Sequence, residues 1–354
     1  MRAFILAAGF GARMGLLGKV VPKPLVPLGG MPVVGFALEK LRRVGVKETV
    51  LNLHHEAETI QREIGDRFSE IKIHYSYEEE ILGTAGGLKK AEEFLRETGE
   101  PFFVLNADAV SNADLGAALA HHKKGGFLAT LILRRSSETK KFGALSVDES
   151  GGLCRFLESK APGEPVGAVT EAMFTGQSVL APEFLDHIPA GRACGISEEV
   201  YPPLIESGAR IGGILTEAYW ADIGTPSRYL EAAADLLGGK FVPEFDWPPE
   251  GYVLVQGKPI AWGEGTVKPP VLVGEDVDLR KGAVAGPFTV LGSGAMLEDN
   301  ASAVRTVIFP GGHVGENSRL ERCIVGPDAV AVPSDATHWL EVFFLAGQMQ
   351  PVPF

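Results

Sequence analysis

Two positively charged residues near the start of the chain, Arg13 and Lys23, have the surroundings that phosphate-binding residues need. Arg13 ends the glycine-rich run 9–13 (GFGAR), and glycine lets backbone N–H groups come close to a phosphate. Lys23 follows ten residues later between Pro22 and Pro24, which restrain the backbone and keep it out of a helix. Together the two cations predict a clamp that holds a triphosphate from two sides.

Two other phosphate-binding motifs do not fit this loop. The dinucleotide fingerprint G-x-G-x-x-G fails because Met14 replaces its third glycine, and because the second strand pattern ends in 52–55 (NLHH) without an acid for a ribose. The Walker pattern fails because Gly18 and Lys19 are followed by Val20 rather than by Ser or Thr. Both of these nucleotide-binding classes are therefore excluded.

The elements that must position the loop alternate between strand and helix. Residues 3–8 are continuously apolar, as in a strand buried on both faces, and the glycine-rich run follows directly. Pro32 then opens a helix with apolar residues at spacings of three and four, which ends at Gly45. Such alternation implies a parallel sheet with helices on both faces, whose ligands bind at the carboxyl ends of the strands. Further strands are expected at 49–53, 71–75 and 101–106, and further helices at 56–68 and 84–95.

The composition is that of a globular protein with excess negative charge. The 354 residues are 45% hydrophobic and 22% charged, which is enough for a sizeable core and about two domains. The net charge of −12 argues against a nucleic-acid partner, because a phosphate backbone needs a basic surface. No run is long enough to span a bilayer, so no membrane partner is expected. Cys154, Cys194 and Cys323 lack metal-ligand spacing and are odd in number, which predicts reduced thiols in a cytoplasmic protein.

A change of composition near Leu237 predicts a domain boundary. Residues 238–250 contain two adjacent glycines and three prolines with little periodicity, as is typical of an interdomain linker. Beyond the linker, apolar residues recur every six positions, and this period favours the hexapeptide repeat of a parallel β-helix. A β-sandwich with coincidental spacing is the alternative. The repeated positions are Val273, Leu279, Ala285, Leu291, Leu297 and Ala303 and, after a slip of one residue, Ile308, Val314 and Leu320.

The phosphate-binding run resembles the N-terminal motif of the sugar-1-phosphate nucleotidyltransferase (nucleotide-sugar pyrophosphorylase) family. Residues 6–14 (LAAGFGARM) and 22–25 (PKPL) are similar to the family patterns L-A-A-G-x-G-T-R-[LM] and P-K-P-L. Ala12 replaces the Thr or Ser of the family, so no role is carried over to that position. The resemblance implies catalytic roles for Arg13 and Lys23 and nucleotide binding by Ala8, Gly9 and Gly11.

Three further segments resemble the family's nucleotide and metal motifs. Residues 82–87 (LGTAGG) resemble the second glycine-rich loop, which lies against the base. Residues 105–108 (LNAD) resemble the strand whose aspartate binds magnesium, with Ala107 in place of glycine, and 220–226 (WADIGTP) closely resembles W-x-D-[IV]-G-T-P. The implied residues are Gly83 and Thr84 for the nucleotide, and Asp108 and Asp222 for Mg²⁺.

Two weaker resemblances concern the sugar phosphate. Residues 156–160 (FLESK) resemble F-x-E-K-P, where Glu holds sugar hydroxyls and Lys holds the phosphate, but Ser159 is inserted between the two. Residues 175–176 (TG) stand where the family has N-x-G, without its Asn. The implied sugar-phosphate residues are Glu158, Lys160, Thr175 and Gly176.

With the repeats, the resemblance implies an α/β protein of two domains. We expect a Rossmann-like nucleotidyltransferase domain with a mainly parallel sheet at 1–237, and a small left-handed parallel β-helix at 251–332. The linker would be 238–250 and the C-terminal tail 333–354. Because the ends and flat faces of a β-helix are open surfaces, a homo-oligomer is expected, with the apolar segment 339–345 as a candidate contact.

The implied reaction joins a nucleoside triphosphate to a sugar-1-phosphate. A sugar phosphate oxygen attacks the α-phosphorus in line and pyrophosphate leaves, so no nucleophilic Ser or Cys is expected. Catalysis would consist of positioning and charge neutralisation by Arg13, Lys23, Lys160 and Mg²⁺.

The predicted substrates are GTP and mannose-1-phosphate, because a β-helix is frequently appended to guanylyltransferases of this type. The alternative is a UTP-dependent enzyme acting on a glucose, N-acetylglucosamine or N-acetylmuramic acid phosphate. A hypothesis of another class is a catalytically inactive paralogue that binds nucleotide sugars and regulates a partner. Ala12 and Ser159 favour this paralogue, whereas Arg13 and Asp222 argue against it. Acyl transfer in the β-helix would have to rely on His313, the one histidine of the repeats.

Overall fold

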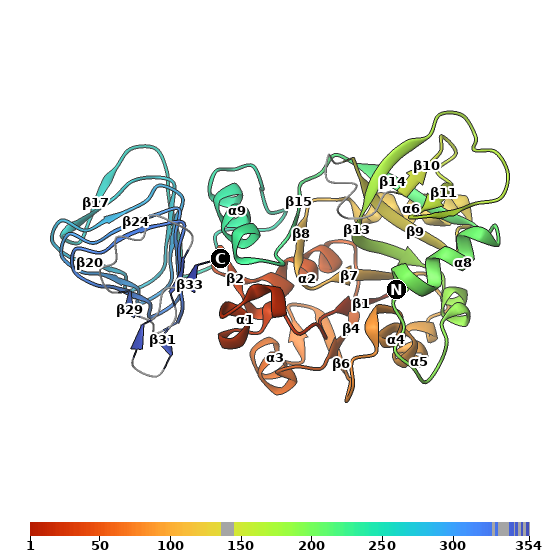
Figure 1. Ribbon diagram of the computed structural model, residues 1–354, viewed down its shortest axis with the longest axis horizontal. Coiled ribbons are helices and arrows are strands. Elements are labelled where there is room, and N and C mark those ends of the chain that lie inside the picture. The colour runs from red at the N-terminus through yellow and green to blue at the C-terminus, as the bar shows by residue number, and fades with distance from the viewer. Residues whose placement is uncertain are drawn as a thin grey trace. The chain divides into compact units, whose positions relative to one another are not determined.

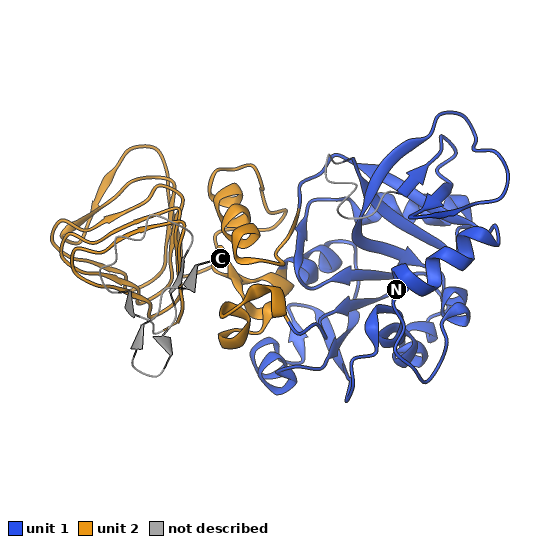
Figure 2. Cartoon of the chain, viewed as in Figure 1, with its two compact units in different colours: residues 1–10, 36–220 blue, residues 11–35, 221–354 orange. Residues whose placement is uncertain are grey.

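The computed structural model describes residues 1–135 and 145–327, and beyond 327 only the backbone of short strands. The chain forms two compact units (Figure 2). Unit 1 consists of residues 1–10 and 36–220, and unit 2 of residues 11–35 and 221–354. This division by contacts differs from a boundary near 237, because residues 11–35 and 221–237 group with the C-terminal part. The domain limits 1–237, 238–250, 251–332 and 333–354 remain predictions.

The centre of unit 1 is a parallel sheet (Figure 1). Its strands run in the order β7-β1-β4-β6, and α4 and α5 pack against β1. The apolar start of the chain is strand β1, of which Ala3, Phe4 and Ile5 are fully buried. The elements are β1 (Arg2–Leu6), α2 (Val33–Arg43), β4 (Glu48–Leu53), α3 (Ala57–Ile64), β6 (Ile71–Tyr77), α4 (Gly83–Lys90), α5 (Glu92–Arg96) and β7 (Phe102–Asn106).

Two of the expected helices have different bounds in the structure. The helix expected at 56–68 ends at Ile64, because Gly65 takes a positive φ of 76° and caps it. Residues 67–68 form the short strand β5 (Arg67–Phe68), which pairs antiparallel with β6. The helix expected at 84–95 is divided at Ala91, whose N–H bonds to the carbonyls of both Gly87 and Leu88.

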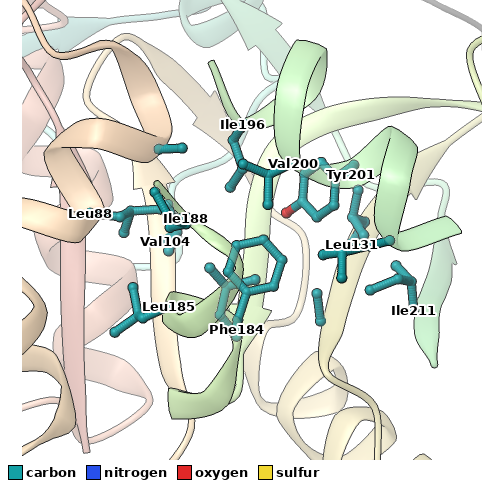
Figure 3. Close-up of a cluster of buried hydrophobic side chains, with 14 of the residues drawn as sticks. Leu88, Val104, Leu131, Phe184, Leu185, Ile188, Ile196, Val200, Tyr201 and Ile211 are labelled. Carbon is teal, nitrogen blue, oxygen red and sulfur yellow. The ribbon is translucent and has the colours of Figure 1, made fainter. Parts of the chain in front are cut away.

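The other half of unit 1 is built around the long strand β13 (Thr170–Leu180). It pairs antiparallel with β7 on one side and with β9 and β10 along its length. Tyr201 and Phe184, whose ring centroids lie 5.6 Å apart, belong to the buried cluster that packs beside this part of the sheet (Figure 3). The remaining elements are β8 (Ala109–Ser111), α6 (Leu115–Gly125), β9 (Ala129–Arg134), β10 (Leu145–Val147), β11 (Leu153–Phe156), β12 (Ser159–Lys160), η3 (Pro182–His187), η4 (Ile196–Val200), α8 (Tyr201–Glu206) and β14 (Ile211–Thr216).

The C-terminal part of unit 2 is a parallel β-helix. Its short strands stack in three sheets, β19-β22-β25-β28, β20-β23-β26-β29 and β18-β21-β24-β27. Val273, Leu291 and Ile308 lie on successive coils of the first sheet. All nine positions of the predicted six-residue repeat have 3% or less of their surface exposed, so the repeat marks the interior of the coil.

The parallel coil begins later than residue 251. Strand β16 (Val253–Val255) pairs antiparallel with β19, and β17 (Ile260–Trp262) pairs antiparallel with β18. In the C-terminal part of unit 2, the first strand with a parallel neighbour is therefore β18. The coil strands are β18 (Gly265–Val267), β19 (Val271–Val273), β20 (Asp278–Leu279), β21 (Val284–Ala285), β22 (Thr289–Leu291), β23 (Met296–Leu297), β24 (Ser302–Val304), β25 (Val307–Ile308), β26 (His313–Val314), β27 (Arg319–Glu321), β28 (Ile324–Val325) and β29 (Val330–Ala331).

Unit 2 also holds the segment with Arg13 and Lys23. The Tyr229 hydroxyl on α9 (Pro226–Leu237) donates to the Pro27 carbonyl at 2.6 Å, and the Trp247 indole N–H donates to the Gly29 carbonyl at 2.8 Å. The ring of Tyr229 also meets Phe309 of the β-helix edge-on, with centroids 6.3 Å apart. The short elements of this segment are η1 (Ala12–Met14), α1 (Leu17–Val20), η2 (Lys23–Leu25), β2 (Pro27–Leu28) and β3 (Met31–Pro32).

Two expectations from composition can be compared with the structure. Within residues 1–135 and 145–327, no helix combines the length and the apolar character that crossing a bilayer requires. Cys154, Cys194 and Cys323 are all free thiols, as their spacing predicted.

Candidate nucleotidyl-transfer site

In unit 1, Ala8, Gly9 and Asp108 lie at one edge of the parallel sheet. Strands β1 and β7 pair in register at Leu6 and Asn106, and the Ala107 N–H donates to the Leu6 carbonyl at 3.0 Å. Gly9 leaves β1 and Asp108 leaves β7 just beyond these residues. The first glycine-rich loop and the predicted metal ligand thus share the carboxyl edge, where parallel sheets bind ligands.

A buried lysine holds strand β8, which follows Asp108, and the loop after this strand. Lys40 is 8% exposed, and its ammonium group donates to the Ser111 carbonyl at 3.0 Å and also to the Ala113 carbonyl. Burying an ammonium group is tolerated only when it is well hydrogen-bonded, so these bonds restrain the loop. Lys40 was not predicted as a site residue, because in the sequence it is one more polar position of an amphipathic helix.

The pair Asn52 and Glu78 joins the two glycine-rich loops. The Asn52 side-chain oxygen accepts the Ala7 N–H at 2.8 Å, and its amide group donates to the Glu78 carboxylate at 2.8 Å. The other oxygen of Glu78 accepts the Leu82 N–H at 2.8 Å. Asn52 and Glu78 were not predicted as site residues. The available signal was an asparagine near the end of the apolar strand pattern TVLNL.

The second glycine-rich loop is held on its other side by the segment around Cys194. Gly83 has a φ of 71°, and a Cβ there would lie 2.6 Å from the Cys194 carbonyl oxygen, so only glycine fits. The same carbonyl accepts the N–H groups of Ala85 and Gly86. The Thr84 hydroxyl accepts the Ile196 N–H at 2.8 Å, which gives Thr84 a structural role beside its predicted role in nucleotide binding.

Gly176 lies against the end of β7. The pairing of β13 with β9 shifts between Phe174 and Ser178, and Gly176 has a φ of 76° inside this irregularity. A Cβ on Gly176 would lie 2.4 Å from the Asn106 amide nitrogen, so the loop approaches the Asp108 turn closely. The Thr175 hydroxyl donates to the Ile132 carbonyl at 2.8 Å, and contact of Thr175 with a sugar remains a prediction.

Glu158 and Lys160 belong to an exposed hairpin. Phe156 pairs with Ser159, which leaves Leu157 and Glu158 as the turn and puts Lys160 on the edge strand β12. The Ser159 hydroxyl donates to Glu206 at 2.6 Å on α8. Because β11, β10 and β13 separate β12 from β7, the sheet does not bring Lys160 next to Asp108. The role of Glu158 and Lys160 in binding the sugar phosphate remains a prediction.

In unit 2, Asp222 lies between two arginines. Its Oδ2 accepts a hydrogen bond from Arg228 at 2.6 Å and is 3.9 Å from the Arg13 guanidinium. A Cβ on Gly224 would lie 2.7 Å from Asp222 Oδ1 and 3.1 Å from Arg13, so both groups lie close against this glycine and a side chain there would displace them. Arg228 was not predicted from the sequence.

Asp222 is not the cap of the helix that follows it. That position belongs to Thr225, whose hydroxyl accepts the Arg228 N–H at 3.3 Å. Helix capping is therefore not the role of Asp222.

Lys23 packs against Gly11 of the first glycine-rich loop. A Cβ on Gly11 would meet the Lys23 Cβ at 3.4 Å, and Gly11 has a φ of 62°. The expectation that the prolines keep Lys23 out of a helix is wrong in detail, because residues Lys23–Leu25 form one 3₁₀ turn. Pro24 is accommodated because a first helical turn leaves its N–H groups unused. The Arg13 side chain is 66% exposed and so is accessible to a ligand.

The predicted magnesium ligands fit the chemistry of that ion. Within the described ranges, no three His, Cys, Asp or Glu side chains gather as a ready-made metal site. Mg²⁺ does not require such a cage, because it is commonly held by one or two carboxylates, water and the phosphates of a substrate. Asp108 and Asp222 supply two carboxylates of the kind that Mg²⁺ accepts, and their role as ligands remains a prediction.

Comparison with known proteins identifies the family of this chain. Residues 2–238 match the family model described as nucleotidyl transferase, and the chain belongs to that family. The narrower class predicted from the motifs, a sugar-1-phosphate nucleotidyltransferase, is also confirmed by the curated relatives.

The relatives carry two different substrate names. A UTP–glucose-1-phosphate uridylyltransferase of Synechocystis sp. is 30% identical over 96% of this chain and 93% of its own length. The mannose-1-phosphate guanylyltransferase catalytic subunit beta of Danio rerio is 31% identical over 92% of this chain and 86% of its own. The mannose-1-phosphate guanylyltransferase of Mycobacterium tuberculosis is 29% identical over 90% and 83%.

Solved structures support the fold. HddC from Yersinia pseudotuberculosis matches with a TM-score of 0.54 and 22% identity, and the match covers 65% of this chain and 97% of that one. The same protein complexed with GMP-PN matches with a TM-score of 0.53 and 22% identity over the same shares. At this identity, the likeness is evidence for the fold alone.

Proposed function

We propose that the protein makes a nucleotide sugar by in-line attack of a sugar-1-phosphate on the α-phosphorus of a nucleoside triphosphate. One phosphate oxygen of the sugar-1-phosphate forms the new P–O bond, and the bond to the β-phosphate breaks to release pyrophosphate. The observation that carries the proposal is the edge of the sheet in unit 1. The first glycine-rich loop and Asp108 leave adjacent strands there, and Asn52 and Glu78 tie the second loop to the first.

Charge neutralisation is the main task of the site, because the two substrates repel each other. Arg13 and Lys23 would neutralise the triphosphate, and Gly11, which has no side chain, lets a phosphate approach the backbone beside them. Ala8, Gly9, Gly83 and Thr84 would contact the nucleotide. Glu158, Lys160, Thr175 and Gly176 would hold the sugar phosphate.

Asp222 and Asp108 are the proposed ligands of Mg²⁺. When bound, Mg²⁺ would neutralise charge on the phosphate oxygens of the substrates. Arg228 holds Asp222 at 2.6 Å and so orients its carboxylate for this task.

We propose GTP and mannose-1-phosphate as the substrates. Several relatives that cover nine tenths or more of this chain are named mannose-1-phosphate guanylyltransferase. UTP with glucose-1-phosphate is the alternative, and the Synechocystis relative supports it. The base would be recognised by the backbone near Ala8, Gly9 and Gly83.

The test is a panel of four nucleoside triphosphates against several sugar-1-phosphates, followed by pyrophosphate release. We expect turnover with at least one pair, and loss of turnover when EDTA removes divalent metal. If no pair turns over while a nucleotide sugar still binds, the chain is a regulatory paralogue. Magnesium added back after EDTA is the control that distinguishes metal dependence from inactivation.

A further inference from the structure

We infer that Asn52 and Glu78 are positioning residues that hold the two glycine-rich loops at the spacing a nucleotide requires. The inference rests on the proposed function and assigns these residues a part in nucleotide binding. Neither side chain needs to touch a substrate. Both act through the backbone of the loops, by the N–H groups of Ala7 and Leu82.

The pair is buried at the ends of adjacent strands. Asn52 is 2% exposed and Glu78 is 4% exposed. Asn52 lies near the end of β4, and Glu78 follows β6 directly, where Leu53 and Tyr77 are in register. A buried carboxylate is expensive to desolvate unless it is hydrogen-bonded, so its bonds to the Asn52 amide and to the Leu82 N–H restrain both partners.

The hydrogen bonds between the loops have a fixed direction. The Ala7 N–H can only donate, so the Asn52 oxygen must face it and the Asn52 amide group must face Glu78. The Leu82 N–H also can only donate, so Glu78 has to accept at both of its oxygens. A carboxylate meets this requirement at position 78, and an amide does not.

Helix α4 also packs directly on this pair. A Cβ on Gly87 would lie 2.8 Å from Glu78 Oε1 and 2.9 Å from the Asn52 amide nitrogen. The loop 82–84 at the start of this helix therefore takes its position from Glu78 at one end and from the Cys194 segment at the other. A shift in the pair would move the second loop relative to the first.

The direction of the bonds suggests an exchange experiment. Glu78→Gln puts an amide group against one of two donors, and Asn52→Asp puts two carboxylates against each other. The double variant Asn52→Asp, Glu78→Gln restores every bond, because Asp accepts from Ala7 and from Gln, and Gln accepts from Leu82. The buried negative charge then moves from position 78 to position 52.

We expect each single variant to lower kcat/KM for the nucleoside triphosphate by about 10- to 100-fold, mainly through KM, because a buried group is left unpaired. The KM for the sugar-1-phosphate should change much less. The double variant should recover to within about threefold of the wild-type value. Glu80→Gln, at an exposed acid two residues from Glu78, is the matched control and should change neither constant.

Melting temperatures separate positioning from simple stabilisation. If the single variants melt lower but keep the wild-type KM for the nucleotide well below their melting temperatures, the pair only stabilises the fold and the inference is wrong. The same holds if the double variant binds nucleotide no better than the weaker single variant. If a single variant does not fold, Asn52→Ala replaces it, because it removes the amide without adding charge.

Failure of the proposed function would be recognisable separately. It would appear as absence of turnover in the wild-type protein with every substrate pair. Calorimetric binding of a nucleoside triphosphate to the wild-type protein, the two single variants and the double variant would then test the positioning role. We expect the two single variants to bind more weakly than the wild type and the double variant. Equal affinities in all four would overturn it.

Discussion

At the scale of single residues, the site is defined by charges that the fold holds close together. Asp222 contacts Arg228 and approaches Arg13, while Lys23 packs behind Gly11. Each of these groups can be altered without removing a large buried side chain. Substitutions here should therefore affect catalysis more than stability.

Lys23→Ala should reduce the rate of pyrophosphate release by about 10²–10³-fold, as expected for loss of one preorganised charge. The melting temperature should stay near the wild-type value, because Lys23 is a half-buried residue at the start of a single 3₁₀ turn. Lys19→Ala is the control, since Lys19 is an exposed lysine on the neighbouring α1. Normal activity of the Lys23 variant would show that the clamp is assigned to the wrong residue.

Asp222→Asn should raise the magnesium concentration needed for half-maximal turnover by about 10- to 100-fold or more. The amide keeps the shape of the side chain but is a poor ligand for Mg²⁺. Arg228→Met is the matched variant, because it breaks the 2.6 Å ion pair and keeps the carboxylate. Equal losses in the two variants, with no change in the magnesium requirement, would mean that Asp222 acts only through its ion pair.

At the scale of elements, helix α6 packs on β9 through a buried histidine. His122 is 3% exposed, and its Nδ1 lies 3.1 Å from the Thr130 hydroxyl. Burial, helped by the nearby His121 and Lys123, lowers the pKa of His122 to about 4. The imidazole is therefore neutral in the folded protein at pH 7.

The free energy of unfolding should consequently decrease as the pH is lowered from about 6.5 to about 4. In this window the unfolded chain binds a proton at residue 122 and the folded chain does not, so protonation favours unfolding. His122→Gln should flatten this part of the profile in denaturant titrations at several pH values. Ala118→Gly on the same helix should lower the free energy of unfolding by about 1 kcal/mol at every pH and leave its dependence on pH unchanged. An unchanged slope in His122→Gln would contradict the explanation.

At the scale of the whole molecule, the β-helix shares a compact unit with the Arg13 segment. Tyr229 and Trp247 donate hydrogen bonds to the carbonyls of Pro27 and Gly29, and Phe309 packs against Tyr229. The C-terminal half of the chain thus supports the loop that carries the predicted catalytic cations.

Self-association is the prediction that belongs to this scale. The ends and flat faces of a β-helix leave surfaces that other chains can cover. We expect light scattering at micromolar concentration to give a mass of at least twice that of one chain. The candidate contact at 339–345 has side chains that lie outside the described residues. A single-chain mass across the concentration range would contradict the prediction.

The sequence by itself determined the class of protein and the interior of the β-helix. Spacing of glycines, prolines and cations along a short loop is a local property, and so is a period of six. Tertiary structure alone decided that Asn52 and Glu78 meet, that Arg228 holds Asp222, and that Glu158 and Lys160 belong to an edge hairpin. These relations depend on strand register, turn geometry and the packing of distant segments. A polar residue in an isolated sequence does not reveal which partner the fold will bring to it.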